Sequence, residues 1–196
     1  MIGAISLMRR RPGITPAAFG KHWRDIHGPL VCAMPGLRRY QQAHVTHALT
    51  DLAEVLAVDG FAQLFFADVA TRTTAYASPE LAACDRDSPL FIGQVARTVT
   101  EIFAFGRGRT AHKLMLLLPP GEPMGETAIA ALPGLAGGQF HAVREQGAAP
   151  NSVVAEFLCP LRAIAELWFT SDDAMRAAAI TCKNAAAYAV REHELI

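Results

Sequence analysis

The sequence predicts an α+β fold, in which two tandem ferredoxin-like β-α-β-β-α-β modules pack sheet to sheet as a β-barrel with helices outside. Strand and helix patterns occur in that order over the first 105 residues. After a glycine-containing linker at 106–109 the order begins again, and short segments of the second half align with the first. Each module alone would leave one sheet face bare, so packing the two faces together buries both. We therefore expect a first module at 1–106 and a degenerate second module at 107–196 that completes the barrel.

Local signals place the elements of the first half. Thr15 is the expected N-cap of the first helix, with Pro16 at its first position, and Pro35-Gly36 ends that helix. Asp68 caps a second helix that extends to about residue 77, whereas the polar stretch 78–89 is expected to be irregular. A short helical turn is expected at 50–56. The apolar or alternating segments that predict strands are residues 2–8, 37–46, 61–66 and 95–105.

The second half repeats parts of the first. Phe61-Ala-Gln-Leu-Phe-Phe66 aligns with Ile164-Ala-Glu-Leu-Trp-Phe169, and Met34-Pro-Gly-Leu37 aligns with Leu132-Pro-Gly-Leu135. Ser171 is the expected cap of a helix that ends near residue 180. Strands of this half are expected at 112–118, 135–145, 164–169 and 185–195.

One segment of the first half has no full counterpart in the second. Pro12 and Pro35 are 23 positions apart, whereas Pro120 and Pro133 are 13 apart. The lost segment corresponds to the one that holds His22, Trp23 and His27. Chemistry that depends on these residues would therefore belong to the first half only.

Composition excludes several classes of protein. The 18 basic and 18 acidic residues balance, which argues against nucleic acid or an acidic membrane as a partner. The four cysteines lack the spacing of a zinc site, and we expect no metal and no disulfide framework. No apolar run approaches the roughly 20 residues of a membrane span. We expect a cytoplasmic protein.

A set of residues in the first half resembles the EthD family, whose members belong to the dimeric α/β-barrel superfamily. The motif combines an aromatic residue and Trp on the first helix, then His before Gly-Pro, then Met-Pro-Gly and a strand Tyr. In this chain it reads Phe19, His22-Trp23-Arg24-Asp25-Ile26-His27-Gly28-Pro29-Leu30, Met34-Pro35-Gly36-Leu37-Arg38-Arg39-Tyr40 and His44-Val45. Family members are generally single modules that dimerise. The resemblance thus implies that the second module replaces the partner subunit, so that the barrel forms within one chain with one pocket; further homodimerisation stays open.

Three residues are the candidate catalytic groups. His27, four residues after Trp23, has a side chain that gains or loses a proton near neutral pH. Tyr40 and His44 lie on one strand with Gln42 between them at alternating positions, so all three face the same side, which we expect to line a polar pocket inside the barrel. His27 would act as acid or base, and Tyr40 or His44 would stabilise a developing oxyanion. A structural role for each remains the alternative.

The candidate substrate-binding residues lie on the first helix and on two aligned strands. Aromatic side chains there could wall a cavity, although aromatic residues on strands are more often plain core. Glu166 replaces Gln63 in the alignment, and a carboxylate inside a barrel would have a raised pKa and could act as a base. His22 is expected to be exposed. The full set is Trp23, Gln63, Phe65, Glu166 and Trp168.

These observations favour a small-molecule enzyme that works without a cofactor. The resemblance implies a lyase, isomerase or cyclase acting on an aromatic, lactone or polyketide-like substrate. One alternative is a non-catalytic accessory protein of a degradation pathway that binds a small apolar or aromatic molecule. Another is a haem protein of the wider superfamily.

Overall fold

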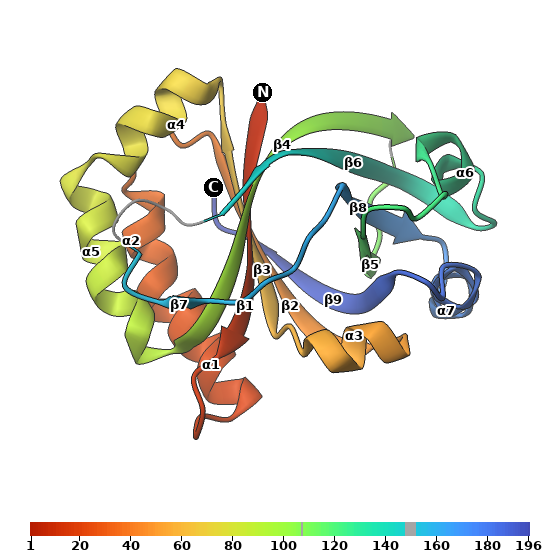
Figure 1. Cartoon of the computed structure of the whole chain (residues 1–196), viewed down its shortest axis with the longest axis horizontal. Helices are drawn as coiled ribbons and strands as arrows, with labels where there is room; N and C mark the ends of the chain where they lie inside the picture. The colour runs from red at the N-terminus through yellow and green to blue at the C-terminus, as the bar shows by residue number, and fades with distance from the viewer. Residues whose placement is uncertain (107, 148–151) are drawn as a thin grey trace.

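The computed structural model describes residues 1–106, 108–147 and 152–196. Its strands close into an antiparallel barrel within one chain (Figure 1). The barrel strands are β1 (Ile2–Arg10), β2 (Arg39–Ala48), β3 (Gly60–Phe66), β4 (Ile92–Gly106), β5 (His112–Leu118), β6 (Leu135–Gln146), β8 (Ala163–Phe169) and β9 (Ala186–Glu194).

The strand order is β1-β3-β2-β9-β5-β8-β6-β4, and β4 pairs back to β1. The two halves have the same internal order: β4-β1-β3-β2 in the first half corresponds to β9-β5-β8-β6 in the second. The halves join where β2 pairs with β9 and where β4 pairs with β6. The predicted α+β barrel is therefore confirmed. The expected linker includes Arg107, which lies outside the described residues, and the domain boundary at 106 stays a prediction.

Helices cover the outside of the barrel in two unequal groups (Figure 1). The first half carries α1 (Pro16–His22), a π-helical turn η1 (Trp23–His27), α2 (Gly28–Cys32), α4 (Val69–Tyr76), α5 (Pro79–Asp87) and the short η2 (Ser88–Leu90). In the second half the described residues form α6 (Glu126–Ala130) and α7 (Asp172–Thr181). The remaining elements are α3 (Asp51–Leu56), which follows β2, and β7 (Ala155–Glu156), which pairs with β4.

The expected helix caps are present. The side chains of Thr15, Asp68 and Ser171 each accept a hydrogen bond from the backbone N–H three residues later. The prediction of an irregular segment at 78–89 was wrong, because α5 occupies most of it. Ser78 caps this helix through Leu81 N–H, and its charged outer face concealed the helical period.

The alternation of strand residues divides the core into layers. Side chains on one face of β1 and β3 point into the barrel, where one end is apolar and contains Ile5, Leu7 and Phe61. The opposite faces pack beneath the helices of their own half. Polar residues gather in the other part of the barrel interior, chiefly Gln41, Gln63, Lys113, His141 and Glu166. No helix of the described residues has the length and hydrophobicity needed to cross a membrane.

Candidate active site

A π-helical turn presents the first candidate residue. Between α1 and α2 the N–H of Gly28 donates to the carbonyl of Trp23, five residues earlier, and such turns occur often at functional sites. Trp23 and His27 are both buried at the two ends of this turn. A Cβ at Gly28 would lie 3.3 Å from the Trp23 carbonyl oxygen and 2.8 Å from a methyl of Leu195, so a side chain there would require Leu195 to shift.

His27 is paired with a carboxylate. Its Nδ1 lies 2.9 Å from Oδ2 of Asp87, the last residue of α5. Burial lowers the pKa of His27, although the hydrogen bond to Asp87 opposes that shift. The imidazole is thus neutral near pH 7 and can accept a proton. Sequence reasoning missed Asp87, because it is 60 positions from His27 and on the segment expected to be irregular.

The second ring nitrogen of His27 is free to act. Within the described residues Nε2 makes no hydrogen bond. It is also not one of the fully buried side-chain atoms without a partner, which in the described residues belong to Arg39, Gln41, Gln63 and Arg72. His27 Nε2 therefore retains access to open space. His27 lines a cavity of about 80 Å³ between the sheet and the helices. It is lined by Ser6, Met8, His27, Val31, Met34, Tyr40, Ala62, Leu64, Tyr76, Leu81, Cys84, Asp85, Ser88, Ile92, Val95 and Arg97.

Tyr40 lines the same cavity and is held by two donors. Its hydroxyl oxygen accepts from Trp23 Nε1 at 2.8 Å and from Gln42 Nε2 at 3.1 Å. Both acceptor positions of the phenol are therefore occupied, and its own proton is left to donate. Burial raises the pKa of Tyr40, so the hydroxyl stays protonated. These features suit a donor to an oxygen of a bound ligand.

His44 lies behind this pair rather than in the cavity. Its ring stacks on Trp23 with centroids 4.4 Å apart, and its Nε2 lies 2.9 Å from Gln42 Oε1. Gln42 Nε2 donates to the Trp23 carbonyl, which fixes the orientation of the amide, so His44 must be the donor to Gln42 Oε1. His44 therefore acts on Tyr40 indirectly, through Gln42 and Trp23.

The prediction that the β2 face with Tyr40 and His44 lines the barrel interior was wrong. Tyr40, Gln42 and His44 do share one face of β2, but that face packs against the π-turn outside the barrel. The barrel interior receives the other face, with Gln41 and Ala43. Alternation predicted which residues lie together, but it could not indicate which face points inward.

His22 also differs from expectation. Its side chain is only 22% exposed, and its Nε2 lies 3.0 Å from Oδ1 of Asp87. The two oxygens of Asp87 therefore bind one histidine each. The ring of Phe91 contacts both, stacked on His22 at 4.8 Å between centroids and tilted against His27 at 4.9 Å.

Most of the predicted substrate-binding residues lie elsewhere. Trp23 belongs to the cluster around Tyr40, but Gln63, Phe65, Glu166 and Trp168 do not line its cavity. Gln63 and Glu166 are fully buried inside the barrel, where Glu166 is paired with Lys113 and hydrogen-bonded to His141. Arg39 lies over the ring of Phe65, and Arg109 and Lys113 lie over that of Trp168.

The expected raised pKa of Glu166 was wrong. Burial alone would raise it, but the Lys113 ammonium and the hydrogen bond to His141 hold the pKa of the carboxyl well below its usual range. Glu166 is thus an ionised partner of Lys113 rather than a base ready to accept a proton.

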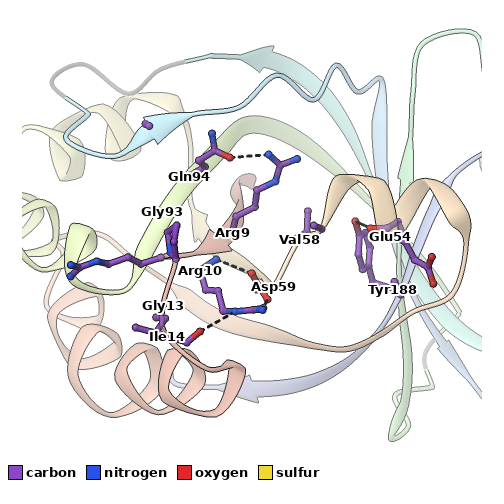
Figure 2. A pocket seen from close by; sticks show the side chains of 16 residues that line it. Arg9, Arg10, Gly13, Ile14, Glu54, Val58, Asp59, Gly93, Gln94 and Tyr188 are labelled. Atoms are coloured by element: carbon purple, nitrogen blue, oxygen red, sulfur yellow. Dashed lines mark hydrogen bonds and ion pairs between the residues drawn. The ribbon is translucent and has the colours of Figure 1, made fainter.

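A larger pocket of about 840 Å³ lies away from these residues, between the β1–α1 connection and α3 (Figure 2). Two of the three arginines that line it, Arg9 and Arg10, are already engaged. Arg10 is paired with Asp59, and Arg9 donates to Gln94 at 2.9 Å, as the dashed lines show. None of the predicted site residues lines this pocket.

Comparisons with known proteins agree with this architecture. An anthrone oxidase-like protein of known structure superposes with a TM-score of 0.64 at 13% identity, covering 98% of this chain and 92% of its own. A candidate monooxygenase from Lactobacillus acidophilus NCFM has a TM-score of 0.52 at 9% identity, covering 97% and 93%. Both likenesses show the fold. The search of curated proteins gave no match.

The first half also matches at the level of sequence. An ethyl tert-butyl ether D (EthD) family protein from Bacillus halodurans C-125 is 22% identical over 52% of this chain and 97% of its own, with a TM-score of 0.44. The family model of the EthD domain matches residues 11–94, which contain the π-turn, Tyr40 and Asp87. The segment that holds His27 and its partners is therefore the segment that the EthD domain model matches.

Proposed function

We propose that this protein binds a small aromatic, lactone or polyketide-like molecule beneath the helices of its first half and catalyses cofactor-free acid–base chemistry on it. The reaction would be that of a lyase, isomerase or cyclase. The observation that carries the proposal is His27, whose Nδ1 is bound by Asp87 while its Nε2 remains free beside a cavity shared with Tyr40.

The chemistry follows from the two side chains. Neutral His27 accepts a proton from an acidic carbon or hydroxyl of the substrate at Nε2, while Asp87 stabilises the imidazolium through Nδ1–H. The electron pair left on the substrate moves to its oxygen, which accepts a hydrogen bond from Tyr40. His27 then returns the proton to a different substrate atom or to a leaving group, so that no net proton or electron is consumed.

His44 was a third catalytic candidate, and the proposal gives it a different task. It orients Tyr40 through Gln42 and does not touch the substrate. The proposal does not include Glu166, Gln63, Phe65 and Trp168, because none of them lines the cavity.

A non-catalytic binding protein is the second candidate, and it needs the same cavity as the enzyme. Ligand pockets usually have volumes of about 300–1,000 Å³, whereas this cavity of about 80 Å³ has room for a few water molecules. An aromatic ligand must therefore displace side chains of α4 or α5 as it enters. A protein that only shields such a molecule would need the cavity and not the free nitrogen of His27.

The experiment has two stages. Thermal unfolding is measured with phenols, quinones, lactones and short polyketide mimics, for the wild type, His27→Gln and His47→Gln. His47 is exposed and serves as the matched control. A ligand at a hundred times its Kd should add roughly 2.7 kcal/mol to the free energy of unfolding. For each ligand found, deuterium incorporation from D2O is then followed by NMR.

Catalysis predicts exchange that His27→Gln slows by about 10²- to 10⁴-fold, while the ligand still binds and His47→Gln behaves as the wild type. A ligand that binds to the wild type without exchange or conversion would reject the enzyme and support the binding protein. Finding no ligand in the panel would reject the proposed substrate class.

A further inference from the structure

The carboxylate of Asp87 is shared between two histidines, and only one of them lines the cavity. Oδ2 lies 2.9 Å from His27 Nδ1, and Oδ1 lies 3.0 Å from His22 Nε2. His22 does not line the cavity. Its effect on the site must therefore pass through Asp87.

An ionised carboxylate only accepts hydrogen bonds, so each ring nitrogen that faces Asp87 must carry a proton. For His27 this selects the tautomer with the proton on Nδ1, which leaves the lone pair of Nε2 beside the cavity. With both oxygens engaged, the carboxylate cannot rotate without breaking a bond to one of the rings. Loss of the His22 bond would leave Asp87 held by His27 alone.

The surroundings reinforce the arrangement. Phe91 contacts both imidazole rings and so restricts their planes. Asp87 and His22 are the ionisable groups whose charges act on His27, and Asp85 and Cys84 precede Asp87 on the same helix.

We propose that His22 is a positioning residue, which holds the Asp87 carboxylate in the orientation that keeps His27 in its Nδ1–H tautomer with Nε2 free for the ligand. This inference rests on the proposed function of His27. If His22 positions Asp87, the tautomer of His27 depends on a hydrogen-bond donor at position 22. A purely structural His22 would have no such effect on the tautomer.

The test uses the nitrogen shifts of 15N-labelled histidine, which distinguish the two tautomers without any ligand. His22→Gln keeps an amide donor for Asp87, and His22→Phe keeps a ring against Phe91 but has no donor. We expect His27 to be almost entirely Nδ1–H in the wild type and in His22→Gln. In His22→Phe the ratio of the tautomers should fall roughly tenfold, as for the loss of one hydrogen bond to a charged group.

An unchanged His27 tautomer in His22→Phe would overturn the inference, as would an equal change in His22→Gln. If His22→Phe does not fold, His22→Leu gives the same comparison with a smaller side chain that also lacks a donor. The outcome is separable from that of the proposed function. A chain that binds no ligand can still show the tautomer change, and a chain that catalyses exchange can still lack it.

Discussion

His44 makes the stability of this protein depend on pH. Burial lowers the pKa of its imidazole to about 4, whereas the unfolded chain has a value of about 6.5. Between these values the unfolded state binds more protons than the folded state, so the free energy of unfolding falls as the pH falls. Well above pH 6.5 both states are neutral at this position and the effect disappears.

We therefore predict that acidification from pH 7 to pH 4 lowers the melting temperature of the wild type, and that His44→Gln reduces this decrease. Thermal unfolding across that pH range measures the difference. His47→Gln removes an exposed histidine and should leave the pH dependence as it is in the wild type. Part of the decrease should persist in His44→Gln, because burial also lowers the pKa values of His27 and His193. Identical pH profiles for His44→Gln and the wild type would contradict the prediction.

At the scale of elements, the π-turn between α1 and α2 is the local feature on which the site depends. It places Trp23 beneath His44 and against Tyr40, and it brings His27 to Asp87 on α5. The sequence predicted one helix from Thr15 to Pro35, with Trp23 and His27 on one face. It could not show the inserted residue, because a π-turn is stabilised by contacts with β2 rather than by local propensity.

Gly28→Ala should disturb this turn. The new methyl would meet Leu195, Gln42 Nε2 and the Trp23 carbonyl oxygen, and overpacking of this kind costs about 1–3 kcal/mol. Chemical denaturation measures the loss, and the 15N shifts of His27 should change with it. Ile26→Ala, at an exposed position of the same turn, is the control and should change stability by less than about 0.5 kcal/mol. Equal stability of Gly28→Ala and the wild type would show that the turn has room to adjust.

At the scale of the whole molecule, the two halves of the barrel differ in the charges that they bury. In the alignment of the two halves Trp168 is equivalent to Phe65, and Glu166 to Gln63. Because Gly3 pairs with Phe65 and Lys113 pairs with Trp168, Lys113 occupies the position of Gly3. Lys113 is paired with Glu166 and Glu192, and Gln41 of the first half donates to Glu192 and Glu194 of the second. This polar cluster therefore joins unlike halves inside one barrel.

Lys113→Met should leave Glu166 as a buried carboxylate without its cation, at a cost of about 3–5 kcal/mol. Adding Glu166→Gln removes that charge, so the double variant should be more stable than Lys113→Met alone. Urea unfolding of the two single variants and the double variant measures the coupling. Glu192→Gln, which changes the more exposed of the two carboxylates, should cost less than Lys113→Met. Additive losses in the double variant would refute the coupling.

Local sequence patterns predicted some elements of this protein and missed others. Periodicity and caps gave the barrel strands and most of the helices, because both depend on neighbours a few residues apart. The helix α5 was missed, since its polar surface hid the buried positions Cys84 and Asp87. The residues that resemble the EthD motif lie within the segment 11–94 that the EthD domain model matches.

Only the tertiary structure decided how the candidate residues meet. It separated Gln63, Phe65, Glu166 and Trp168 from His27, because these four lie on β3 and β8 and none of them lines the cavity that His27 lines beneath the helices. It brought Asp87 to His22 and His27, and it turned Tyr40 toward the helices. The sequence by itself determines which residues share a face, since that follows from the geometry of a strand or a helix. Which face is buried, and against which distant segment, is decided by the packing of the two sheets and their helices.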